Sequence, residues 1–385
     1  MAQELPIIKN WRAHAGGAVP SGTLELPLMI DVHVIAEIRG ECGPYSFLNL
    51  VSVRDGAAVI RRGIMLRCHI AENLQPQIHS LQTNTESYHG GSLFDEIAAL
   101  TSLLLEARVR PGNIEREWSV DSDPMGRPRD WGQVPEPVLH LRSGRPVLPC
   151  VVGTRDLRTL QKLNLILALD FPQSIALMRA ARFYQDALWL AESEPNLAWL
   201  MLVSALESVA CCWDAVGGDD VSKLLAAKPD LHALLAGRND PAFLAAVARI
   251  LAPTLKATKK FIDFGLRFLP SPPERRPEQF LQIDWSTSSW KSILGTIYKY
   301  RSNALHAGVP FPSPMGEPPF EHEGRIPSEK GSVGLAAHHH GGSWNSADLP
   351  INLNLFAMVT RQMLLAWLES FQPATGASPL IAGPV

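Results

Sequence analysis

The sequence predicts an α+β protein in which a β-rich N-terminal domain precedes an all-α helical bundle. Residues 1–170 carry short apolar, β-branched runs between Gly and Pro turns, whereas from about Asp156 apolar residues recur at helical spacing in long segments. A chain of 385 residues has the length of two to three domains and can bury a full core without disulfides. We therefore expect domains at 1–170 and 171–372, followed by a mobile tail at 373–385.

In the N-terminal domain we predict a small antiparallel sheet, one helix and a packed loop. The helix near 92–107 has Ser92 as its N-cap, acidic residues in its first turn and leucines at helical spacing along one face. Residues 123–149 are rich in Pro and Gly and form the loop. Three runs bounded by turn residues are the predicted strands: Leu28 to Ile38, Phe47 to Val53 and Ile64 to Ile70.

The second domain is predicted as a succession of helices with one long interruption. Residues 308–350 are rich in Pro, Gly and Ser and are too long for an ordinary connection between helices. The helical patterns are Leu157 to Leu169, Pro172 to Ala191, Pro195 to Val216, Val221 to Leu235, Ala242 to Leu251, Thr254 to Phe268, Ser288 to Ala307 and Ile351 to Phe371.

The composition limits the classes of function. A formal net charge of -3 excludes the strongly basic balance of broad, salt-dependent nucleic-acid binding, so any contact with RNA must be compact. Five cysteines without a CxxC pair lack zinc-site spacing and are typical of a reducing compartment. No secretory signal, P-loop, nucleophile elbow or HExxH helix is present. We therefore predict a cytoplasmic protein with no cofactor, no metal and no DNA partner.

Three further features have a functional and a structural interpretation. Leu197 to Trp213 is the most membrane-like segment, but Ser204 and Glu207 interrupt it, which favours a buried helix and no membrane partner. Consecutive histidines at 338–340 could bind a metal, although neighbours in a loop point in different directions and are expected to be solvated. Several arginines could clamp a phosphate or make local hydrogen bonds: Arg108, Arg110, Arg116, Arg127 and Arg129.

One helix carries the candidate catalytic residues. The apolar stripe of the helix predicted at 288–307 reaches Arg301, where a leucine would be expected. A guanidinium on such a seam needs a carboxylate, a phosphate or water, and Glu207 is the other charge within an apolar helix. His306 follows five residues later, where the negative end of the helix favours a cation. Together, Arg301 could hold a phosphate and His306 could move a proton in phosphodiester cleavage.

The context of this pair resembles a known family. Arg-x4-His alone is weak, because roughly one match is expected by chance in this chain. The segment Ile297 to Gly308, however, resembles the last core helix of the HEPN superfamily, specifically its Apea-like branch. The segment Trp199 to Val209 resembles an earlier core helix with an acidic residue after small apolar ones, here Glu207. The resemblance covers about residues 172–372.

The resemblance implies a HEPN-like bundle that forms a homodimer, in which Arg301 and His306 of both copies build a metal-independent endoribonuclease site. Ser302 or Asn303 would supply the polar residue that often follows the arginine. Members of the family commonly act in antiviral defence or as toxins. Gly308 stands where a His-x-Tyr extension would place tyrosine, which argues against regulation by adenylylation.

A second interpretation stays open beside the nuclease. Arg301 could serve only as the partner of Glu207 and fix the register of two helices. The bundle would then be a non-catalytic module for dimerisation and ligand binding. Residues 308–350 follow His306 directly and could gate the site in either case.

Overall fold

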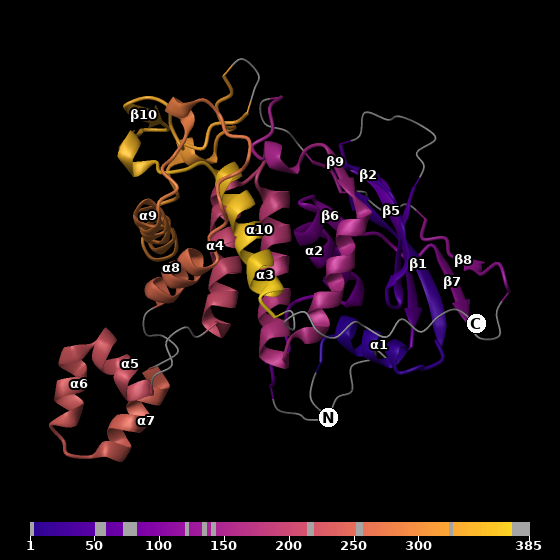
Figure 1. Ribbon diagram of the computed structural model, residues 1–385, viewed down its shortest axis with the longest axis horizontal. Coiled ribbons are helices and arrows are strands. Elements are labelled where there is room, and N and C mark those ends of the chain that lie inside the picture. Colours follow the sequence, from indigo (N-terminus) through magenta and orange to yellow (C-terminus); the bar gives the residue numbers. More distant parts are fainter. Residues whose placement is uncertain are drawn as a thin grey trace.

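A computed structural model describes residues 4–50, 59–71, 83–119, 123–132, 137–139, 144–213, 219–251, 257–322 and 326–371. It confirms a mixed α and β protein with a sheet region followed along the chain by a helical region (Figure 1). The predicted tail at 373–385, the end of the strand predicted to reach Val53 and the helix end near Val216 lie outside the described residues.

The sheet has seven strands and is antiparallel. Its order is β3-β4-β5-β1-β7-β8, and β6 also pairs with β1. Alternate residues of β1 and β5, such as Leu26, Leu28, Ile64 and Leu66, point into the core. The strands are β1 (Gly22–Ile30), β3 (Ile38–Cys42), β4 (Tyr45–Asn49), β5 (Arg61–Ile70), β6 (Val109–Pro111), β7 (Arg116–Ser119) and β8 (Arg127–Pro128).

The strand predicted from Leu28 to Ile38 is wrong as a single element. It is divided among the end of β1, β2 (His33–Ile35) and the start of β3. Asp31 lies at the break, where its carboxylate accepts hydrogen bonds from the backbone N–H and the guanidinium of Arg108. The chain therefore leaves the sheet there, and β2 pairs in parallel with β9 (Thr154–Asp156). The strand predicted at Ile64 to Ile70 is confirmed within β5.

Two helices adjoin the sheet. Helix α2 (Leu93–Leu105) confirms the helix predicted near 92–107, and Ser92 and Asp95 form its capping box. It lies between the sheet and α3 (Figure 1). Helix α1 (Pro6–Ala15) was not predicted, and it buries Ile7, Ile8 and Trp11 in the same core.

The long helices stand beside this layer and follow the predicted order. Val221 to Leu235, predicted as one helix, is two, because Pro229 begins a new helix and cannot continue the preceding one. The segment predicted as a helix at Leu157 to Leu169 is the 3-10 helix η2 (Leu157–Ala168). The α-helices are α3 (Phe171–Leu190), α4 (Pro195–Cys212), α5 (Asp220–Ala227), α6 (Pro229–Ala236), α7 (Pro241–Leu251), α8 (Ala257–Arg267), α9 (Thr287–His306) and α10 (Leu353–Glu369).

The long interruption after α9 contains local structure. Strands β10 (Ala336–His339) and β11 (Gly342–Asn345) form a hairpin. Short 3-10 turns occur at η5 (Ser313–Gly316) and η6 (Ser346–Asp348), as well as earlier in the chain at η1 (Pro149–Val151) and η4 (Gln279–Leu281). Segment 308–350 is therefore partly ordered into elements rather than a plain loop.

One hydrophobic core runs through the sheet and the long helices, from Leu5 to Leu368. The boundary expected at residue 170 falls inside this core, between η2 and α3. Helices α5, α6 and α7 form a separate lobe around Leu224, Leu235 and Ala248, away from the sheet (Figure 1). Among the described helices, α4 alone has the length and apolar composition to cross a membrane, yet it packs on α3, α8, α9 and α10.

Candidate active site at the end of helix α9

Helix α9 carries Arg301 and His306, and its sequence explains where it begins and ends. The Ser286 side chain caps the first turn by accepting a hydrogen bond from the Ser289 N–H. Trp290, Leu294 and Ile297 are buried on the face that packs into the core. After His306 the chain reverses at Gly308, whose φ of 66° is the left-handed conformation that favours glycine at a helix end.

Arg301 is bound to Glu207 of α4, as the sequence predicts. Arg301 Nη2 donates to Glu207 Oε2 at 2.8 Å. The other carboxylate oxygen, Oε1, accepts a hydrogen bond from the Tyr298 hydroxyl at 3.0 Å. The guanidinium also lies 5.5 Å from the centroid of the Tyr298 ring. Glu207 therefore fixes two side chains of α9 at once.

Tyr298 was not identified from the sequence, although its spacing contains a signal. It lies three residues before Arg301, so both side chains reach the same side of the helix. Burial, together with the negative charge of Glu207 and the hydrogen bond to it, raises the pKa of Tyr298 to about 12. The hydroxyl therefore stays protonated at neutral pH and remains a donor to Glu207.

The Arg301 guanidinium keeps unused hydrogen-bonding capacity. Its Nε is buried and has no partner, and no described residue accepts a hydrogen bond from Nη1. The side chain is 22% exposed. An oxygen of an incoming anion could therefore reach this guanidinium without displacing Glu207.

His306 lies at the open end of α9. The residue is exposed, and its imidazole makes no hydrogen bond or ion pair with any described residue. Ser302 and Asn303, between the two candidates, are half-buried, and their side chains make no hydrogen bond with the described part of the chain. The end of the helix is accordingly open to solvent.

Within one chain, Arg301 and His306 do not converge. Five residues along a helix rotate the side-chain direction by about 140° and advance it by about 7.5 Å. Arg301 points toward α4, whereas His306 ends the helix on another side. One phosphate held between both groups requires either a bridging substrate or a second copy of the chain.

A groove of about 900 Å³ lies next to Glu207, between α3 and α4. From α4, Ser204, Glu207, Ser208 and Cys211 face it at helical spacing. From α3 it receives mainly apolar side chains together with Arg179, namely Phe171, Pro172, Ile175, Ala176 and Phe183. Glu207 therefore both lines the groove and forms the ion pair with Arg301.

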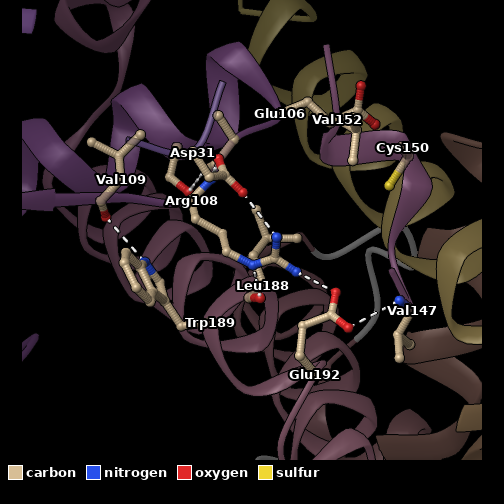
Figure 2. Close-up of polar contacts among 12 residues, drawn as sticks. Asp31, Glu106, Arg108, Val109, Val147, Cys150, Val152, Leu188, Trp189 and Glu192 are labelled. Atoms are coloured by element: carbon tan, nitrogen blue, oxygen red, sulfur yellow. Dashed lines mark hydrogen bonds and ion pairs between the residues drawn. The ribbon is translucent and has the colours of Figure 1, made fainter. Parts of the chain in front are cut away.

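The arginines that could have clamped a phosphate do not form one cluster. Arg108 is inside the protein, 2% exposed, and binds Asp31, Glu192 and the Leu188 carbonyl (Figure 2). Arg110 pairs with Asp186. Arg116 and Arg129 line one cavity beside β1, where the former donates to the Met125 carbonyl and the latter pairs with Glu117. The local interpretation holds for these four side chains.

His338 and His339 point to opposite faces of β10, as expected for consecutive strand residues, whereas the His340 ring lies against that of His339 with centroids 4.0 Å apart. His338 is exposed, whereas His339 faces inward from the same strand. In the described ranges, no group of three His, Cys, Asp or Glu side chains is placed to hold a metal ion.

No family model, no curated protein and no solved structure matches the chain.

Proposed function

We propose that this protein is a metal-independent endoribonuclease of the HEPN type that works as a homodimer, in the role of a defence or toxin effector. One observation supports it above the others: His306 is exposed, with no partner among the described residues, at the end of the helix in which Glu207 and Tyr298 position Arg301. A positioned cation and an accessible imidazole are the two groups that phosphodiester cleavage uses.

In this reaction, the 2′-hydroxyl of a ribose attacks the adjacent phosphorus while His306 takes its proton. The bond from phosphorus to the 5′-oxygen breaks, and the leaving oxygen takes a proton from water, whose hydroxide is neutralised by the proton that His306 releases. The products are a 2′,3′-cyclic phosphate and a 5′-hydroxyl. Arg301 would stabilise the charge that builds on the phosphate oxygens through Nη1, which no described residue engages.

The direction of the two side chains supports a dimer. Because Arg301 and His306 leave α9 on different sides, two copies that meet at this end could place the arginine of one beside the histidine of the other. The open groove between α3 and α4 adjoins Glu207 and offers a largely apolar surface for that contact. Cytoplasmic residence fits this role, since all five cysteines are free thiols.

RNA cleavage in excess EDTA tests the proposal. We expect wild-type protein to cut single-stranded RNA and leave cyclic phosphate ends, and His306→Ala to lose at least about 100-fold in rate. His33→Ala, at another exposed histidine, is the matched control and should retain activity. Circular dichroism shows that each variant is folded. Intact RNA with wild-type protein over a range of salt concentrations, or equal cleavage by His306→Ala, would refute the proposal.

The alternative is a non-catalytic module for dimerisation and ligand binding. It is favoured by the ion pair itself, because Arg301 already has a carboxylate partner and needs no phosphate. Sedimentation of the same preparation separates the two functions. A dimer that cleaves no RNA supports the module, whereas cleavage that depends on His306 supports the nuclease.

A further inference from the structure

A second cavity, of about 430 Å³, lies between the start of α4, the segment after α9 and the β10–β11 hairpin. Its volume is at the small end of the range found for pockets that hold small molecules. All of its lining residues are described by the structure: Pro195, Asn196, Trp199, Val309, Pro310, Phe311, Pro312, Ser313, Gly316, His339, His340, Gly341, Gly342 and Trp344.

The walls of this pocket are flat and held in place. Trp199 is 1% exposed and enclosed between Phe311 and Phe356, with ring centroids 5.2 Å and 4.9 Å away, so it forms closed wall, whereas Trp344 is half-buried and keeps ring surface accessible. Trp344 lies against the backbone of Gly342, where an added Cβ would be 2.2 Å from the indole ring. Gly342 thus lets the hairpin hold this ring at the pocket. Aromatic surfaces of this kind stack on planar heterocycles.

The polar groups of the pocket favour an anion. The lining contains no Asp, Glu, Lys or Arg, and its titratable groups are His339 and His340. Trp199 is only 1% exposed, and no described residue accepts a hydrogen bond from its buried Nε1–H. The pocket also includes Pro195 and Asn196 of the first turn of α4, where Pro195 has no N–H and the Asn196 N–H has no side-chain cap.

The hairpin is built to bring the imidazoles to the pocket. His339 Nδ1 lies 2.5 Å from the Ser313 hydroxyl, which fixes the ring, and its Nε2 is 3.9 Å from Glu317. His340 has a φ of 45° and Gly341 a φ of 80°, so the turn places a non-glycine residue in the left-handed region. Such a conformation costs stability and is found preferentially at functional sites.

We propose that this pocket binds a nucleotide, with its base on the Trp344 ring and its phosphate at the first turn of α4 beside His339 and His340. The nucleotide could be free or part of an RNA chain, since both offer the same base and phosphate. The pocket adjoins the segment that follows His306 but shares no residue with the candidate catalytic pair. Binding here therefore goes beyond the proposed cleavage and does not depend on it.

Calorimetric titration of the full chain carrying His306→Ala tests the pocket without cleavage. The ligands are adenosine 5′-monophosphate, adenosine and a six-residue oligoadenylate. We expect the monophosphate to bind more tightly than adenosine, and Trp344→Ala to weaken binding at least about fivefold. Binding of the monophosphate alone assigns the pocket to a free nucleotide, and tighter binding of the oligomer assigns it to RNA. The proposal is overturned if neither the monophosphate nor the oligoadenylate binds, or if adenosine binds as tightly as its monophosphate.

A second variant tests the pocket independently, in case Trp344→Ala does not fold. Val309 lines the pocket and is 55% exposed, so Val309→Trp fills the mouth without disturbing the core. Val152→Trp, at a 60% exposed valine outside the pocket, is its control. We expect Val309→Trp to abolish binding and Val152→Trp to leave it unchanged. Undiminished binding by Val309→Trp would place the ligand elsewhere and overturn the proposal, whatever the outcome of the RNA cleavage assay.

Discussion

The guanidinium of Arg108 contacts the carboxylate of Glu192 at 2.8 Å inside the core, where neither side chain is more than 2% exposed. The same guanidinium binds Asp31 at 2.8 Å, and the Leu188 carbonyl accepts a hydrogen bond from its Nε (Figure 2). The second oxygen of Glu192 accepts from the Val147 backbone. One arginine therefore joins the end of β1, the segment after α2 and the end of α3.

Replacing Arg108 tests how strongly this network holds the protein together. Arg108→Met leaves two buried carboxylates without a cation, so we expect a loss of about 3–5 kcal/mol in the free energy of unfolding. Urea denaturation followed by circular dichroism measures it. The control is Arg110→Met, whose ion pair with Asp186 is half-exposed and should cost less than about 1 kcal/mol. Similar losses in both variants would contradict the role of burial.

The core position of Arg108 shows what the sequence could not predict. Helices were placed well, because apolar spacing and breakers such as Pro195 are local features. Contacts between segments 77 to 84 residues apart, such as those of Arg108, leave no local pattern. In the sequence, Arg108 belongs to a group of neighbouring arginines that could clamp a phosphate or make local hydrogen bonds. Asp31 falls inside the strand predicted from Leu28 to Ile38.

For the candidate sites too, local features were predictable and contacts between distant segments were not. The pairing of Arg301 with Glu207 was predictable, because each is a charge on the apolar face of its helix and charges on such faces need partners. The pocket bounded by Trp199 and Trp344 was not, because it forms only where three distant segments meet.

A contact between His89 and Glu96 predicts a dependence of stability on pH. His89 Nδ1 donates to the Ser87 carbonyl, and its Nε2 lies 2.9 Å from Glu96 Oε1. Burial lowers the pKa of His89, but the contact with Glu96 and the hydrogen bond to Ser87 outweigh it, so the pKa is raised above 6.5. Burial chiefly raises the pKa of Glu96 above 4.5.

Both shifts have the same consequence. A histidine whose pKa is raised by folding contributes stability that is present below pH 6.5 and lost as the pH rises through its folded pKa. A carboxyl group with a raised pKa likewise loses stability as the pH increases from 4.5. We expect the free energy of unfolding to fall as the pH rises above 6.5 and through the folded pKa of His89. Denaturant titrations of His89→Gln should show a smaller decrease over this range, whereas His33→Gln should match wild type. An unchanged slope in His89→Gln would contradict the assignment.

The shared carboxylate of Glu207 predicts coupling between its two partners. Tyr298→Phe removes one hydrogen bond to Glu207 and should cost about 1 kcal/mol of stability. Arg301→Met removes the ion pair and should cost about 1–2 kcal/mol, because both side chains are about one-fifth exposed. A double-mutant cycle measures the interaction. We expect non-additivity of at least about 0.5 kcal/mol, and additive losses would show that the two contacts are independent.

Arg361 of α10 predicts that the two halves of the chain unfold together. Its guanidinium donates to the carbonyl oxygens of Leu103 and Leu104 at the end of α2, about 257 residues earlier in the chain. Arg361→Met would leave these two carbonyls without that donor, and we expect a loss of about 2–3 kcal/mol. Lys162→Met is the control, because Lys162 joins η2 to α10 through an exposed ion pair with Glu369 worth at most about 1 kcal/mol.

Hydrogen exchange measures which elements are destabilised by Arg361→Met. Because one core includes residues of both β5 and α10, Arg361→Met should reduce the protection of amides in these two elements by similar factors. If the halves fold independently, as a domain boundary at residue 170 implies, α10 would lose protection while β5 kept it. The shared burial of Leu66 and Leu364 in one cluster favours the first result, since opening either element exposes the apolar surface of the other.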